Sequence, residues 1–200
     1  MIGALMQILP VTTGVYVAST RLTAIVVHGT LTTGTLLLAL SFMTNWPGVA
    51  RLAFIFLAIA FGWLLIAVAL GMVRHRHTRV TASEPLFRAA QLALLALLMT
   101  VILGLALQAV RAWGLRLSVP GITDIHGAWG LLGWVGLLLA GVTFKVIPVF
   151  QSTELYPRPV MRALAPSIFI VLAIWSALTI WLPHTVRWPA VGGRPSRRLG

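Results

Sequence analysis

Long apolar runs alternate with short polar segments along this chain, and they are the first guide to its structure. No charged residue occurs between His126 and Lys145, for example. The runs lack the two-residue alternation of barrel strands, so they predict helices. The predicted helices cover residues 1–17, 22–43, 49–73, 86–110, 124–150 and 161–182.

Every predicted helix except the first is long enough to cross a membrane. Residues 124–150 reach roughly 40 Å at 1.5 Å per residue, whereas the hydrocarbon core of a bilayer is about 30 Å thick. A chain in lipid satisfies its backbone hydrogen bonds internally, and uninterrupted apolar runs do so as helices. We therefore predict an all-α integral membrane bundle over residues 1–183, with five full transmembrane helices and one partial N-terminal helix that Pro10 interrupts. Residues 184–200 are basic and are predicted to form a disordered tail.

The composition agrees with this class and excludes several functions. Hydrophobic residues make up 59% of the chain and charged residues 9%, whereas soluble domains carry about 25% charge. The absence of cysteine excludes disulfides, thiolate nucleophiles and iron–sulfur clusters. The formal net charge of +12 comes mainly from arginines between the apolar runs and in the tail, where cations contact lipid headgroups. The predicted partner is the lipid bilayer, and no nucleic acid is expected.

The loop arginines predict the orientation of the bundle. One side would hold Arg21, Arg74, Arg76, Arg79, Arg88, Arg158 and Arg162, and the other side Arg51, Arg111 and Arg116. The excess of cations makes the first side cytoplasmic by the positive-inside rule. The arginines of the tail favour the opposite orientation.

A histidine and a series of glycines mark the predicted helix over residues 124–150. The glycines recur every third residue, at Gly127, Gly130, Gly133 and Gly136, and His126 stands at the first turn. An imidazole beside a nearly bare backbone leaves room for a flat macrocycle, which predicts His126 as a haem or metal ligand with Gly127 and Gly130 lining the cofactor. The alternative is an interfacial histidine in water, with the glycines serving close helix packing.

A second histidine lies within the predicted helix over residues 22–43. His28, Thr32 and Thr35 stand at positions i, i+4 and i+7, which places them on one face. His28 is therefore also a candidate haem or metal ligand, or a proton-relay group. In the alternative, it bonds a neighbouring helix and the threonines bond carbonyls of their own helix. Since His28 and His126 would lie roughly 15 Å apart along the membrane normal, they are not expected to bind one iron together.

The start of the chain matches the end of the glycine-rich run. Gly3, Gln7, Pro10 and Val11 fall on Gly141, Lys145, Pro148 and Val149 when the sequence is shifted by 138 positions. An internal repeat would make parallel four-helix units, which occur in membrane carriers. It would also mean that the first helix lacks its opening half and that the chain is a fragment. Gln7 and Lys145 are then polar groups at membrane depth, unless Lys145 extends to the headgroups.

The runs from His126 to Gly136 and from Val146 to Gln151, together with Gly3 to Pro10 and His28-Gly29-Thr30, resemble uncharacterised bacterial multi-pass proteins related to haem–copper oxidase subunit I. The resemblance implies an all-helical, haem-binding bundle in the bacterial inner membrane, whose histidines ligate haem and copper. An oxygen-reducing site needs more histidines than lie in these spans, including an adjacent pair. Copper and oxygen reduction are therefore not expected of this chain alone, and only haem ligation by His126 and His28 carries over.

The resulting functional hypothesis is a haem protein of the inner membrane that acts in electron transfer or in handling a diatomic gas, with other membrane subunits or an electron-transfer partner. Whether the chain is an enzyme stays open. A permease built on the repeat is the first alternative, and an assembly subunit without a cofactor is the second.

Overall fold

The computed structural model of the chain describes residues 2, 3, 6, 7, 10, 19–76, 84–152, 154 and 156–181. Helices are the only regular elements in this part, as predicted. They are α2 (Thr20–Thr44), α3 (Pro47–Arg76), α4 (Glu84–Trp113), α5 (Val119–Ala128), the π-helix η1 (Trp129–Gly136), α6 (Leu137–Gln151) and α7 (Arg158–Trp181). Most of the predicted helix over residues 1–17 and the whole of the predicted tail lie outside the described residues.

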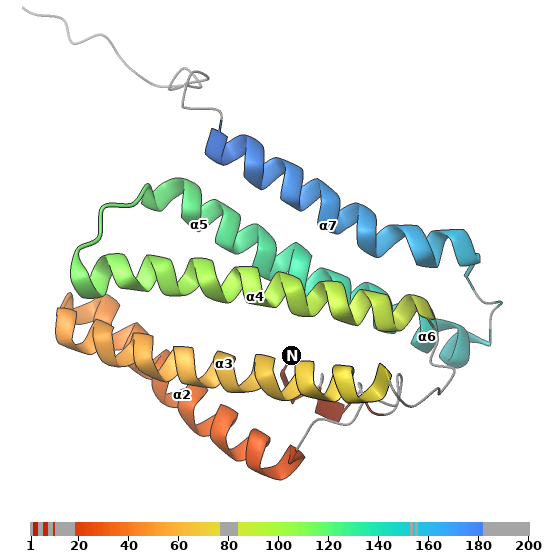
Figure 1. Cartoon of the computed structure of the whole chain (residues 1–200), viewed down its shortest axis with the longest axis horizontal. Coiled ribbons are helices and arrows are strands. Elements are labelled where there is room, and N and C mark those ends of the chain that lie inside the picture. The colour runs from red at the N-terminus through yellow and green to blue at the C-terminus, as the bar shows by residue number, and fades with distance from the viewer. Residues whose placement is uncertain are drawn as a thin grey trace, which may run out of the picture.

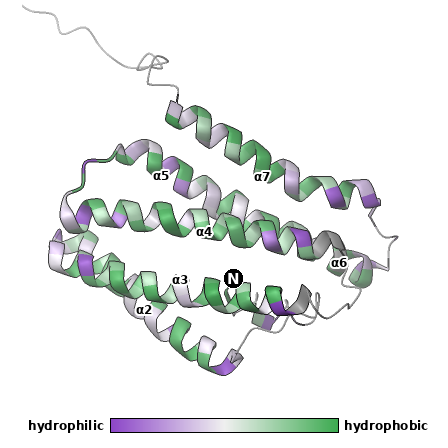
Figure 2. Cartoon of the chain, in the orientation of Figure 1, coloured by the Kyte–Doolittle hydropathy of each residue, from purple (hydrophilic) through white to green (hydrophobic). Residues whose placement is uncertain are grey.

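Five stretches of the described chain are long and apolar enough to cross a membrane, in agreement with the predicted number of full spans. They are α2, most of α3, most of α4, the continuous helix α5–η1–α6, and α7. Figure 2 shows hydrophobic residues along the lengths of these helices and hydrophilic residues mainly toward their ends. Many large apolar side chains also point outward, among them Leu36, Ile66 and Val171. Lipid contact explains this surface, and the chain is a multi-pass membrane protein.

Helix α4 lies at the centre of the bundle. It packs against α3 on one side and against α5, η1, α6 and α7 on the other, while α2 packs on the far side of α3 (Figure 1). Small residues such as Ala89, Ala93 and Ala96 are buried along α4, and they let the neighbouring helices approach closely. The order of the helices across the bundle separates α2 from α5, the two helices that carry the candidate histidines.

Polar contacts tie α2, α3 and α4 together at one end of the bundle. The Arg111 guanidinium on α4 donates from Nη2 to the carbonyl of Ser41 (2.8 Å) near the end of α2. In turn, Arg51 on α3 donates from Nε to the carbonyl of Ala112 (3.0 Å) at the end of α4. Buried Gln108 donates to the carbonyl of Ala50 (3.0 Å). Each arginine thus places a cation at the C-terminal end of another helix, where free carbonyls and the helix dipole favour positive charge.

The predicted helix over residues 124–150 is wrong in two respects. It begins five residues earlier, at Val119, because Pro120 fits the first turn of a helix, where no amide donor is needed. Its middle is π-helical and not α-helical, with bonds that span five residues in place of four. Gly136 suits this wider turn, since an added Cβ would lie 3.3 Å from the carbonyl oxygen of Leu131, five residues before it.

The other predicted boundaries lie within three residues of the observed ends, the largest differences being at Arg76, Trp113 and Arg158. Pro148 does not break its helix, which continues to Gln151.

Candidate functional site

His126 packs between α5 and α4 and is held by one hydrogen bond. Its Nδ1 lies 2.9 Å from the backbone carbonyl oxygen of Thr100 on α4. A carbonyl only accepts, so Nδ1 carries the proton in this contact. In the neutral ring, Nε2 is then the atom with the lone pair, and it makes no hydrogen bond within the described part of the chain. This is the arrangement in which a metal-binding histidine is usually held, with the second ring nitrogen bonded to a carbonyl or carboxylate.

Gly104 makes the room for this ring. A Cβ built on Gly104 would lie 2.8 Å from Cε1 and 3.3 Å from Nδ1 of His126. Such a distance is shorter than van der Waals contact, so any side chain at position 104 would displace the imidazole. Neither Thr100 nor Gly104 was predicted from the sequence. An isolated glycine inside the apolar run of α4 was the available signal, because such a glycine often marks close packing.

Some glycines of the series pack against a neighbouring helix, and another borders open space. A Cβ at Gly133 would meet the Ala96 side chain at 2.9 Å, and one at Gly130 would meet the Thr100 side chain at 3.3 Å. These two glycines let η1 approach α4 closely. This is the packing role that was the alternative to cofactor binding. A Cβ at Gly127 would have no atom within 4 Å, so only this predicted cofactor-lining glycine borders free space.

The opposite side of η1 is anchored to α7. The indole Nε1 of Trp129 donates to Oγ of Ser176 (2.8 Å), and both side chains are buried. Phe169 packs edge-on against the Trp129 ring, with 5.1 Å between the ring centroids. The segment that follows His126 is therefore fixed between α4 and α7, which limits how far the imidazole can move.

His28 lies elsewhere in the bundle. It is exposed on α2, and α3 and α4 stand between α2 and α5 (Figure 1). Its side chain makes no hydrogen bond within the described residues, so the predicted alternative of a bond to a neighbouring helix is not seen there. No group of three or more His, Cys, Asp or Glu side chains able to hold a metal is found in the described part. The two histidines do not come together, as their predicted depths indicated.

The remaining predicted polar groups are also spread out. Thr32 and Thr35 are exposed on α2 with His28, and Thr35 donates to the carbonyl of Leu31 (2.6 Å) in its own helix. Gln7 is exposed near the start of the chain. Lys145 lies in α6, but its side chain falls outside the described part.

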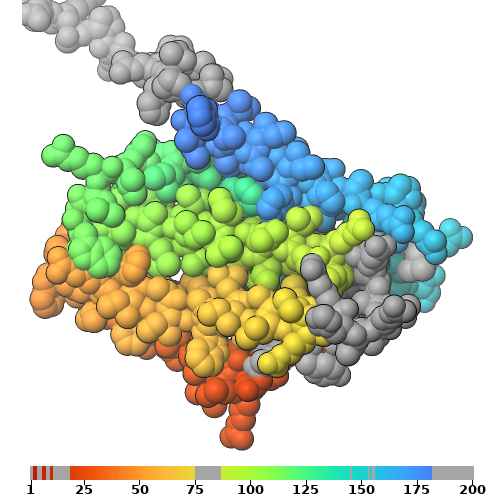
Figure 3. Space-filling view, in the orientation of Figure 1, coloured from red at the N-terminus to blue at the C-terminus, as the bar shows by residue number. Residues whose placement is uncertain are grey.

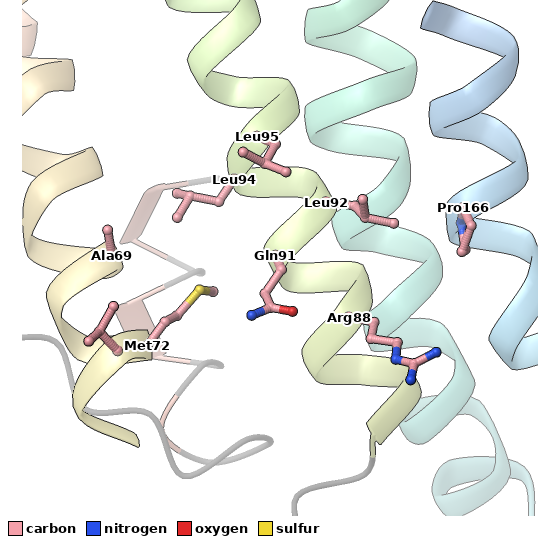
Figure 4. A pocket seen from close by; sticks show the side chains of 9 residues that line it. Ala69, Met72, Arg88, Gln91, Leu92, Leu94, Leu95 and Pro166 are labelled. Carbon is pink, nitrogen blue, oxygen red and sulfur yellow. The ribbon is translucent and has the colours of Figure 1, made fainter. Parts of the chain in front are cut away.

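A pocket of about 540 Å³ lies among α3, α4 and α7, away from both histidines. Its walls are mostly apolar and include Met72, Leu95 and Pro166 (Figure 4). Gln91 supplies an uncharged polar group, and Arg88 precedes it by about one turn of α4 (Figure 4). The size and lining are typical of a site for a small, largely apolar molecule with a polar head.

These features define a helical, multi-pass membrane protein with one half-buried imidazole anchored between two of its helices. Comparisons with known protein families, with characterised proteins and with solved structures give no match. The function must therefore be inferred from the chemistry of the residues.

The described residues around His126 would supply one nitrogen donor to a haem. The donor is suitable because its proton is held on Nδ1 by Thr100, which leaves Nε2 for a metal. His28, the other histidine within the described spans, lies beyond α3 and α4 and therefore does not reach the same site. A Cβ on Gly127, the next residue along the helix, would have no atom within 4 Å.

Proposed function

We propose that this chain is a haem-binding protein of the bacterial inner membrane and that Nε2 of His126 is its axial ligand. The observation that carries the proposal is the 2.9 Å contact between Nδ1 of His126 and the Thr100 carbonyl. This contact holds the proton on Nδ1 and leaves the lone pair of Nε2 for a metal, as in most metal-ligating histidines.

The single imidazole favours one kind of haem chemistry. A haem iron with one protein ligand keeps its other axial position for a diatomic gas, whereas two protein ligands suit electron transfer. We therefore favour gas binding, with electron transfer requiring a second ligand from a partner subunit. The protein contributes the orientation of His126, fixed by Thr100 and Gly104, and the exclusion of water by the packed helices.

A haem titration of the purified chain in detergent tests the proposal. The unmodified protein should develop a Soret band that saturates at one haem per chain, and His126→Ala should bind at least tenfold more weakly. His28→Ala is the matched control and should bind like the unmodified protein, because His28 lies on a different helix and faces outward. A protein that stays colourless, or equal binding by His126→Ala, would contradict the proposal.

Transport is the second candidate function, and the pocket beside Gln91 favours it. Benzoate, a small carboxylate with an apolar ring, suits the mixture of apolar walls and the Arg88 cation. If the pocket is a transport site, proteoliposomes should take up benzoate and Gln91→Leu should reduce uptake severalfold, while exposed Glu154→Gln should not. Uptake that matches protein-free liposomes would count against transport of this class of substrate.

A further inference from the structure

Helix α2 is the outermost helix at one edge of the bundle. It packs against α3 through one face, where Thr23, Val27, Gly34 and Ser41 are buried. Gly34 makes the contact close, since a Cβ there would lie 2.9 Å from the Leu57 side chain and 3.1 Å from its backbone nitrogen. The rest of the circumference of α2 is turned away from the bundle, and Figure 3 shows its first turns projecting from the surface.

The face of α2 opposite α3 is unusual because it carries polar groups. We call the exposed set Ile25, His28, Gly29, Thr32, Leu36 and Ala39 the outward face. Thr35 satisfies its hydroxyl within its own helix. The side chains of His28 and Thr32, in contrast, make no hydrogen bond within the described part of the chain.

These two polar side chains lie at membrane depth. His28 and Thr32 follow the start of α2 by roughly 12 Å and 18 Å at 1.5 Å per residue. Lipid tails offer neither donors nor acceptors there, so an imidazole facing them loses the hydrogen bonds that it makes in water. A second transmembrane helix with polar side chains at the same depth would restore them.

We propose that the outward face of α2 is the contact between two copies of this chain. A neutral imidazole and a hydroxyl each both donate and accept, so the face is complementary to itself, as a twofold interface requires. Two copies insert in the membrane in the same direction, and each residue therefore meets its counterpart at equal depth. His28 of one copy therefore bonds His28 of the second copy, and Thr32 bonds Thr32, since each group can donate to and accept from its counterpart. Gly29 permits the approach, because a Cβ at this position would have no atom within 4 Å in the single copy.

The absence of cysteine from the chain allows a direct test with single-cysteine variants. Leu36→Cys places a thiol on the outward face, and Ile174→Cys is the matched control, an exposed apolar position on the other outer helix, α7. Oxidative cross-linking in membranes at low protein density should give a covalent dimer for Leu36→Cys, at least fivefold above Ile174→Cys. Equal cross-linking at both positions, or none at Leu36→Cys, would overturn the proposal.

A second comparison asks whether the polar side chains hold the dimer together. In the Leu36→Cys background, His28→Leu with Thr32→Val should weaken association about sevenfold, the loss expected for two interhelical hydrogen bonds. Both replaced side chains are exposed, so the fold of the single copy should persist. Undiminished cross-linking would overturn the role of these residues. A Leu36→Cys thiol that cross-links only to a different membrane protein would overturn the choice of a second copy. None of these readouts depends on haem.

Discussion

At the scale of single residues, the glycines that follow His126 have different structural roles despite their regular spacing. Gly133 lies where η1 touches α4, and a methyl group there would meet Ala96 at 2.9 Å. Gly127 has open space beside it. The sequence predicted the series and its two alternative uses, but a period of three residues does not reveal which glycine faces which neighbour. The π-helical turns set the direction in which each glycine faces, and no residue type in the sequence predicts a π-helix here.

Gly133→Ala should lower the free energy of unfolding by about 1–3 kcal/mol, because the added methyl group overpacks the contact between η1 and α4. Reversible unfolding in detergent would measure the loss. Gly127→Ala adds the same methyl group at the first glycine of the series, where a Cβ meets nothing within 4 Å, and should be neutral or slightly stabilising because alanine favours helix. If both variants lower the free energy of unfolding by the same amount, the close contact of Gly133 with α4 would be contradicted.

Gly104→Ala tests whether the position of the His126 ring matters, while the ring itself is kept. The new Cβ would lie 2.8 Å from Cε1 of His126, so the ring must shift from the Thr100 carbonyl. Haem affinity should then fall about tenfold, a change of about 1.4 kcal/mol in binding free energy. Gly62→Ala on α3 is the control, because a Cβ there meets nothing within 4 Å. Equal affinities of the two variants would show that the ring does not depend on this contact.

His126 itself could be selected from the sequence, since an ionisable side chain at the edge of an apolar run is a candidate by default. Its partner could not. The acceptor is a backbone carbonyl 26 positions earlier in the chain, and every residue has a carbonyl. Only the packing of α5 on α4 selects Thr100.

At the scale of elements, helix ends are stabilised by arginines from neighbouring helices. The Arg111 guanidinium carbon lies 4.2 Å from the centroid of the Phe42 ring, and Nη2 reaches both the Ser41 carbonyl and Oδ1 of Asn45. From the sequence, Arg51 and Arg111 are predicted only as loop cations that set topology. Their additional role needs the end of α2, the start of α3 and the end of α4 to meet, which hydrophobic periodicity does not specify.

Arg111→Met should destabilise the end of α2. Hydrogen bonds from a charged donor are worth about 1.5–3 kcal/mol, but buried Nε of Arg111 has no acceptor in the described part, which offsets some of the gain. We expect a net loss of about 1–2 kcal/mol in unfolding free energy. Arg116→Met, at an exposed position between α4 and α5, should change it by about 0.5 kcal/mol or less. A loss of equal size in the two variants would contradict the capping role.

At the scale of the whole molecule, the class and the number of full spans followed from the sequence, because length and hydropathy in lipid leave few alternatives. The order of the helices across the bundle did not follow. It depends on which small residues face each other, such as Gly34 against Leu57 and Gly133 against Ala96. That order puts α3 and α4 between His28 and His126, so it separates the two ligands that the sequence predicts.

The alternation of the spans predicts which residues a membrane-impermeant maleimide reaches. Asn45→Cys and Trp113→Cys lie at one end of the bundle and Ser152→Cys at the opposite end. If the distribution of loop arginines sets the orientation, the first two should be labelled from outside the cell and the third only after lysis. Ile59→Cys, within α3, should stay unlabelled in both cases. Labelling of Asn45→Cys and Ser152→Cys from the same side would contradict the predicted topology.

The most direct test of the central claim, that Nε2 of His126 holds a haem, is chemical rescue of the absorption spectrum. His126→Gly removes the ligand, and free imidazole added to the haem-treated variant can take its place. We predict a Soret band in the unmodified protein, its loss in His126→Gly, and its return with imidazole but not with a non-ligating aromatic such as toluene. A His126→Gly protein that keeps the band of the unmodified protein without imidazole would contradict the claim.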